Sequence, residues 1–490
     1  MIKSKRLSMV FVAAVFAVAM FGCSKPADEG KIPITTKSDE ARKEYMLGRD
    51  LTDRLQTHEA NGHFDKAIAA DPEFAMAYLL RGNGAASTTE FMEYVGKAVS
   101  HAGTASEGER LVILAAEAGS VGDAAKRKEL LDKLVAAYPK DERAHELLGT
   151  YYQTQQDYPD AVGHLKAATD IAPAYAPVYN TLGYTYRAME KYPEAEQAFK
   201  KYTELLPGDP NPYDSYAELL LKEGKFDQSI ENYNKALAKD PNFISSKQGI
   251  AFNHLYMGQP DQAADEIRSM MSSARDETER GQARLDLIIL YLDRGNTPMA
   301  LQYIDSGYAE SEKRNDLLDL AQGLDFKGVV QEEAGNYAAA RELYDREMKM
   351  IESSSLSAER KEGFVRGNHY HAAILAVAAN KINDAKAHAA EYEKLVSVKP
   401  TPARQRAMHE LNGRIALGAK EYDRAIEELG KANLEDAYNL YRLALAYAGK
   451  GDAAKAKEYC AKAAHFYSLP DANYAFVRLK AGKMLAGMKE

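Results

Sequence analysis

The chain has 490 residues, of which 46% are hydrophobic and 28% are charged, as in an ordinary folded protein. Its formal net charge at pH 7 is −9, which argues against nonspecific binding to nucleic acid, because such binding needs Lys and Arg side chains that neutralise phosphates. No nucleic-acid partner is therefore expected.

The first 22 residues have the pattern of a secretory signal peptide. Residues 1–6 are basic, and residues 7–21 form an apolar run that falls short of the about 20 residues needed to span a membrane. The run ends at Gly22 and Cys23, and the sequence Met20-Phe21-Gly22-Cys23 resembles the cleavage box of bacterial lipoproteins.

The lipoprotein resemblance implies that residues 1–22 are removed and that Cys23 becomes the lipidated first residue of the mature chain, with palmitate among its acyl groups. Ser24 stands where an Asp retains some bacterial lipoproteins at the inner membrane. The favoured location is therefore the outer membrane, facing the periplasm. A soluble exported chain with an incidental Cys is the alternative interpretation.

Residues 23–37 are predicted to form a flexible tether between the lipid and the folded part. They contain Pro26, Gly30 and Pro33 and show no helical period. Loss of residues 1–22 removes three basic residues and no acidic one, so the formal charge of −9 becomes −12 in the mature chain.

The chain has only two cysteines, Cys23 and Cys460. If Cys23 carries lipid, no disulfide can form within the chain, and the fold must depend on packing. Cys460 falls at a core position of the last repeat described below, so we expect it to be buried.

One residue pattern recurs every 34 positions through the middle of the chain. The recurring positions are Gly149, Gly183 and Ala217; Ala161, Ala195 and Ser229; and Pro173, Pro207 and Pro241. Such a period predicts an all-α fold of stacked helix pairs, in which small residues allow paired helices to cross closely. A solenoid of this kind is a binding scaffold, and the pattern points away from a catalytic pocket.

The repeat closely resembles the tetratricopeptide repeat family, and the resemblance covers most of the chain after the tether. The unit that ends at Pro207 carries Leu182, Gly183, Tyr186, Ala195, Phe199 and Pro207. The resemblance implies an α-solenoid that winds as a right-handed superhelix. The Trp of the family's first helix is missing, since the chain has no Trp at all.

About twelve helix pairs are predicted, and they divide into two parts. Residues 38–272 keep the 34-residue period, whereas the spacing stretches to about 40 residues between Ser272 and Leu356, which predicts longer helices in residues 273–490. The segment from Asp471 to Met488 is amphipathic and is expected to cap the solenoid as a closing helix.

The resemblance also implies where a partner binds, because the first helix of each repeat lines the concave surface in this family. Aromatic and Arg side chains are enriched among residues that dominate binding energy. The predicted partner-binding residues are Asn180, Tyr184, Arg187, Gln248, Phe252 and Tyr256. A free C-terminal carboxylate is not the expected ligand, because Glu146 and Thr150 occupy two positions that would have to hold it.

No catalytic residue, metal site or cofactor is predicted. His369 and His371 form the only tight histidine pair, and their i, i+2 spacing on a helix points the rings apart, unlike the i, i+4 pair of zinc-binding helices.

These observations predict a non-catalytic, membrane-anchored scaffold that binds a protein or peptide in the concave groove. The alternative is a surface lipoprotein that binds glycans or nutrients on a helical-repeat scaffold. Such proteins use Trp to stack on sugars, and the absence of Trp favours the protein-binding hypothesis.

Overall fold

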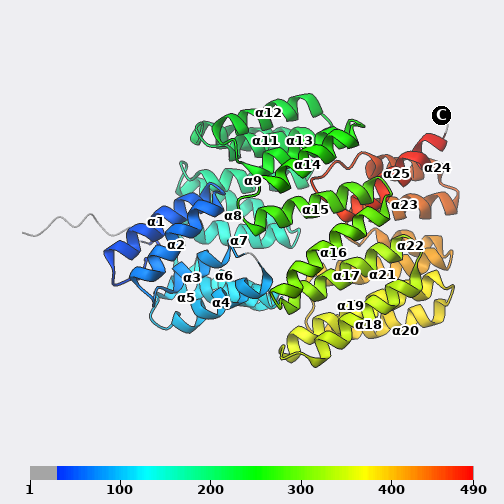
Figure 1. The fold of residues 1–490 in the computed structure, drawn as a ribbon, viewed down its shortest axis with the longest axis horizontal. Helices are drawn as coiled ribbons and strands as arrows, with labels where there is room; N and C mark the ends of the chain where they lie inside the picture. The colour runs from blue at the N-terminus through cyan, green and yellow to red at the C-terminus, as the bar shows by residue number, and fades with distance from the viewer. Residues whose placement is uncertain (1–29, 86, 489–490) are drawn as a thin grey trace, which may run out of the picture.

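The computed structural model describes residues 30–85 and 87–488. The predicted signal peptide and Cys23 lie outside these residues. The described part contains 25 helices and no strands, so the all-α prediction is confirmed (Figure 1). None of the described helices combines the length and the apolar character that crossing a membrane requires.

Twelve helix pairs stack side by side, and one last helix follows them, as predicted. The first seven pairs are α1 Asp39–Asp53 and α2 Thr57–Ala70; α3 Ala75–Gly82 and α4 Thr88–His101; α5 Glu107–Ser120 and α6 Ala124–Ala137; α7 Glu142–Thr154 and α8 Tyr158–Ile171; α9 Ala176–Ala188 and α10 Tyr192–Leu205; α11 Asn211–Lys222 and α12 Phe226–Lys239; α13 Ile244–Tyr256 and α14 Pro260–Ser272. The other helices are α15 Glu277–Asp293 and α16 Thr297–Lys313; α17 Leu317–Glu333 and α18 Tyr337–Ser353; α19 Ala358–Ala378 and α20 Ile382–Val398; α21 Pro402–Gly418 and α22 Tyr422–Leu429; α23 Ala437–Lys450 and α24 Ala453–Ala464; and α25 Ala472–Gly487.

The predicted register of small residues at the helix crossings is confirmed. Gly149 faces Leu165 and Gly183 faces Phe199 across their own pairs. A Cβ atom added to Gly183 would lie 2.4 Å from the Phe199 ring, so no larger residue fits there without movement. The small residue lets the two helices of a pair approach closely enough for the large one to fill the crossing.

Local capping explains where helices begin, including one in a region where the small-residue pattern is lost. Ser106 accepts a hydrogen bond from the Glu109 backbone while the Glu109 side chain accepts one from the Ser106 backbone, which fixes the start of α5. Ser87 starts α4 in the same way by accepting from the Glu90 backbone. Helix pairing therefore continues through residues 75–139.

The stretched spacing after Ser272 corresponds to longer helices from α15 to α21, whereas α22 to α24 have only 8 to 14 residues, so the lengthening does not extend over all of residues 273–490. Helices α15 to α18 have 17 residues each, whereas α7 to α14 have 12 to 14. The change of length does not interrupt the core. Phe252 of α13 and Leu287 of α15 belong to one buried cluster that crosses the boundary between the two predicted parts.

Residues 31–37 do not extend freely, although they fall within the predicted tether. The backbone N–H of Ile32 donates to Asp141 at 2.8 Å, and that of Thr35 donates to Glu109 at 2.8 Å. The Lys31 ammonium also pairs with Glu142. This segment is therefore fixed along the starts of α5 and α7.

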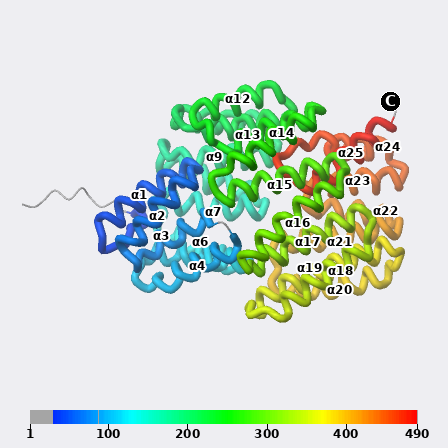
Figure 2. Tube along the Cα trace, in the orientation of Figure 1, coloured from blue at the N-terminus to red at the C-terminus, as the bar shows by residue number. Residues whose placement is uncertain are grey.

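The solenoid closes on itself, because the second half folds back toward the first (Figure 2). Arg406 of α21 donates to the Gln155 carbonyl at 3.0 Å, and Gln156 donates to Asn433 at 2.8 Å. At the end of the chain, α25 packs against α15 and α23, as its red ribbon beside the green α15 shows in Figure 1. Part of the concave face is therefore covered by the chain's own C-terminal region.

Candidate binding groove on the concave face

Helix α9 presents three of the predicted partner-binding residues to the concave side. Asn180 is half-buried, and its side-chain oxygen has no hydrogen-bond partner. Tyr184 donates to Glu218 of α11 at 3.0 Å, and Arg187 donates to the other oxygen of Glu218 at 2.9 Å. The Arg187 guanidinium also lies 4.6 Å from the centroid of the Tyr184 ring. Glu218 therefore holds both side chains in place along the groove.

Helix α13 contributes the other three predicted residues, and one of them does not face the groove. Phe252 is 1% exposed and lies in the core between α13, α15 and α25, because these two later helices cover this part of the concave face. Gln248 is also buried and donates to Asp286 of α15 at 2.7 Å. Burial raises the pKa of Asp286 to about 7.

Tyr256, at the end of α13, contacts the C-terminal segment directly. Its hydroxyl donates to the backbone carbonyl of Ser468. Its ring lies 5.6 Å from that of Tyr467 and 5.7 Å from that of Tyr474 of α25. A residue predicted to bind a partner thus binds residues more than 200 positions later in the same chain.

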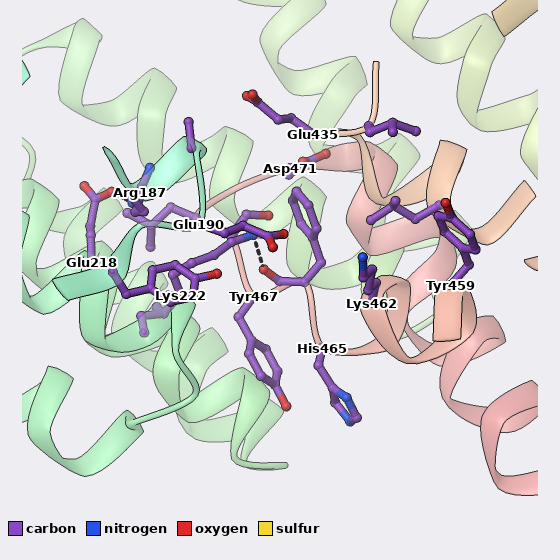
Figure 3. A pocket seen from close by; sticks show the side chains of 18 residues that line it. Arg187, Glu190, Glu218, Lys222, Glu435, Tyr459, Lys462, His465, Tyr467 and Asp471 are labelled. Carbon is purple, nitrogen blue, oxygen red and sulfur yellow. Dashed lines mark hydrogen bonds and ion pairs between the residues drawn. The ribbon is translucent and has the colours of Figure 1, made fainter. Parts of the chain in front are cut away.

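The residues from His465 to Asp471, which we call the strap, join α24 to α25 and lie against the groove. Lys222 of α11 donates to the Phe466 carbonyl at 2.6 Å, and its ammonium lies 3.4 Å from the centroid of the Phe466 ring (Figure 3). Lys222 forms no ion pair within the described residues. Burial, followed by the nearby Arg187 charge, lowers the pKa of Lys222 to about 8.

Beside the strap lies an open cavity of about 660 Å³, which Figure 3 shows from close by. One wall comes from α9 and α11 and carries Arg187, Glu218 and Lys222. The opposite wall comes from Lys462 near the end of α24 and from His465 of the strap. The cavity therefore presents both charges together with aromatic surface, a mixture that suits a protein segment better than an apolar small molecule.

A second cavity, of about 750 Å³, lies on the other side of the strap. It is bordered by the turns after α1, α3 and α12, by the start of α15, and by Leu469 and Pro470. Several amide side chains line it, among them Asn61, Asn83 and Gln282. Leu469 borders both cavities, so the strap lies between the two open spaces.

Sequence reasoning missed the strap. The signal that could have revealed it is the composition of residues 465–471, His-Phe-Tyr-Ser-Leu-Pro-Asp, between the last repeat and the closing helix. A connection of this kind needs only a polar turn, yet this one carries two aromatic residues and a Leu. Apolar residues in a turn indicate that the turn itself is packed against something.

Within residues 30–85 and 87–488, no group of three or more His, Cys, Asp and Glu side chains is arranged to hold a metal ion. The rings of His369 and His371 have different neighbours, His388 and Asp325, at 3.3 and 2.9 Å. Cys460 is fully buried, as expected, and its thiol donates to the Ala481 carbonyl.

A closed stack of helix pairs with an open groove on its concave side defines an α-solenoid, the architecture of a protein-interaction scaffold. Residues 153–219 and residues 211–243 each match a family model described as tetratricopeptide repeat. Residues 153–243 are therefore tetratricopeptide repeats, and the other helix pairs of the described chain share their all-α architecture. No curated protein is similar enough in sequence to match it.

Solved structures of repeat proteins resemble parts of the chain. They include MamA from Desulfovibrio magneticus RS-1 (18% identity over 36% of this chain and 97% of that one, TM-score 0.30). A tetratricopeptide repeat protein from Parabacteroides merdae has 17% identity over 62% and 98% of the two chains, with a TM-score of 0.31. A thermophilic protein of the same type from Thermus thermophilus has 20% identity over 44% and 99%, with a TM-score of 0.30. Likeness at this level carries no argument about partners.

Proposed function

We propose that this protein is a non-catalytic scaffold, anchored to a bacterial membrane through lipid on Cys23, that binds a segment of another protein in the concave groove. The main support for the proposal is that the strap already lies in the groove. The groove binds an irregular segment through two backbone carbonyls, those of Phe466 and Ser468. Backbone carbonyls are common to all peptides, so the same donors suit a segment from a partner.

Space beside the strap supports this function. The cavity of about 660 Å³ is bordered by Arg187 and Lys222 on one side and by Tyr459 and Lys462 on the other. Tyr and Arg side chains are enriched among the residues that dominate protein–protein binding energy. A partner segment in this cavity would touch both the middle repeats and the last repeat.

Photo-crosslinking from the cavity wall tests this function. We expect a benzoylphenylalanine residue at Lys462, whose side chain is 48% exposed at the cavity, to give crosslinked adducts in intact membranes. The matched control is Lys200 on α10, which is 60% exposed and, like Lys462, pairs with a Glu four residues earlier. Lys200 lines neither cavity, so it should give no adduct. Adducts from position 200 alone would place the binding surface on the outer face and contradict the proposal.

The anchor is proposed from the sequence of residues 20–23 and has its own test. Cys23→Ser is expected to leave the protein soluble or uncleaved with its fold intact, because stable membrane binding needs several acyl chains. Detergent phase partitioning of wild type and variant measures this. Cys460→Ser is the control, since that thiol is buried and should not affect partitioning. A Cys23→Ser variant that fractionates with membranes as the wild type does would refute lipidation at Cys23.

A further inference from the structure

The strap differs from an ordinary connection in how it is held. Residues 466–468 have no regular secondary structure, and their carbonyls accept hydrogen bonds from Lys222 and Tyr256, which lie more than 200 residues earlier. The Tyr467 ring meets the Phe226 ring edge-on at 5.0 Å. These contacts are those of a peptide lying in a binding groove, made here by the chain's own residues.

The two hydrogen-bond donors of the groove contact groups that many other segments could supply. The Lys222 ammonium is held by a carbonyl and a ring face and makes no ion pair in the described part of the chain, although the carboxylates of Glu190 and of Asp471 in the strap lie near enough to act on its pKa. Tyr256 donates to a carbonyl, a group that every residue carries. Any segment that supplies an aromatic ring and a carbonyl in the same positions would satisfy both donors.

The backbone of the strap is strained at one residue, and α25 is held by contacts of its own. Tyr467 has a φ of +39°, in the left-handed region that costs energy for any residue with a side chain. Helix α25 has its own attachment, because Arg478 pairs with Asp293 of α15 at 2.6 and 2.5 Å. This ion pair can hold α25 in place when residues 466–468 leave the groove, a movement that also breaks the contact of the Phe466 ring with Tyr474 of α25.

We propose that the groove recognises in its protein partner an irregular segment with the chemistry of residues 465–471, namely adjacent aromatic residues followed by an aliphatic residue and Pro, and that this segment competes with the strap for the groove. The inference rests on the proposed function, since it names the kind of segment that the groove binds. The open cavities on both sides, each bordered by Leu469, give room for the competing segment to enter.

A labelled peptide tests the competition on the full chain. The probe is a fluorescein-labelled peptide of residues 463–473, with a scrambled peptide as control. The variant Phe466→Ala with Tyr467→Ala loosens the strap and keeps the groove donors Lys222 and Tyr256. We expect this variant to bind the probe at least about tenfold more tightly than the wild type, because a site that is free for only part of the time has an apparent affinity reduced by that fraction. Adding Tyr256→Phe should weaken the gain.

Hydrogen exchange on the unmodified chain gives a second readout that needs no variant to fold. Amides of residues 465–471 should exchange faster when excess probe is present, and the fluorescein separates the mass of the probe from fragments of the chain. Unchanged exchange, or probe binding no tighter than that of the scrambled peptide, would overturn the inference. A wild-type dimer that the double substitution dissociates would assign the groove to a second copy and overturn it as well. Adducts from position 462 without probe binding would leave the proposed function standing and reject this inference alone.

Discussion

Replacing Arg478 by Met is expected to lower the free energy of unfolding by about 3–5 kcal/mol, the cost of breaking a buried ion pair on one side. The Asp293 side chain is 3% exposed and accepts two hydrogen bonds from the Arg478 guanidinium, at 2.6 and 2.5 Å. Without Arg478 the carboxylate would stay buried and unpaired between α15 and α25. Chemical denaturation followed by circular dichroism measures the loss.

The double variant Arg478→Met with Asp293→Leu is the control for this prediction. Two apolar side chains leave no buried charge, so much of the lost stability should return. If the single variant were as stable as the wild type, α25 would not be attached to α15 through this pair. The structure would then give no reason to expect that the strap can move while α25 stays in place.

Gly249→Ala is expected to destabilise the protein by about 1–3 kcal/mol, the usual cost of overpacking a core. A Cβ atom on Gly249 of α13 would lie 2.0 Å from the Tyr233 ring of α12, and Tyr233 is fully buried. Because the ring is fully buried, it can move only by displacing its neighbours. Ala is ordinarily the better helix former by about 0.8–1 kcal/mol, so helix propensity alone would make the Gly249→Ala variant more stable. A loss of stability would therefore come from the close contact between α12 and α13.

Gly163→Ala on α8 is the matched substitution in open surroundings. Nothing lies within 4 Å of a Cβ atom added to Gly163, and the residue is exposed on its helix. This variant should be more stable than the wild type by about 0.5–1 kcal/mol. Thermal melting of both variants should therefore give shifts of opposite sign, and shifts of equal sign would contradict the crossing described for α12 and α13.

The sequence predicted the stacked pairs because the information needed for them is local. Gly183 and Phe199, which contact each other, are 16 positions apart in one repeat. Because the sequence pattern has a period of 34 residues, the corresponding contact recurs in each repeat. The longer helices directly after Ser272 followed from the same spacing, and the closing helix near Asp471 followed from its amphipathic pattern. The burial of Cys460 could be predicted for the same reason, since it occupies a repeating core position.

The occupied groove could not be predicted in this way. Tyr256 and Ser468 are 212 positions apart, and their contact depends on how far the whole stack turns. A repeat pattern specifies the rotation between neighbouring helix pairs only approximately. It therefore does not predict that a long stack of repeats turns far enough for its two ends to meet. Phe252 shows the consequence, because its position on the concave side was predicted but the helices that cover it were not.

The ion pair between α15 and α25 sets an order of events during synthesis. Asp293 and Arg478 are separated by 185 residues, and a chain grows from its N-terminus at roughly 5–20 residues per second. Helices up to α14 can stack as they emerge, but the face of α15 that holds Asp293 then waits roughly 10–40 s for its partner. During that interval the growing chain displays the apolar surface of α15 with an unneutralised acid at the last residue of the helix.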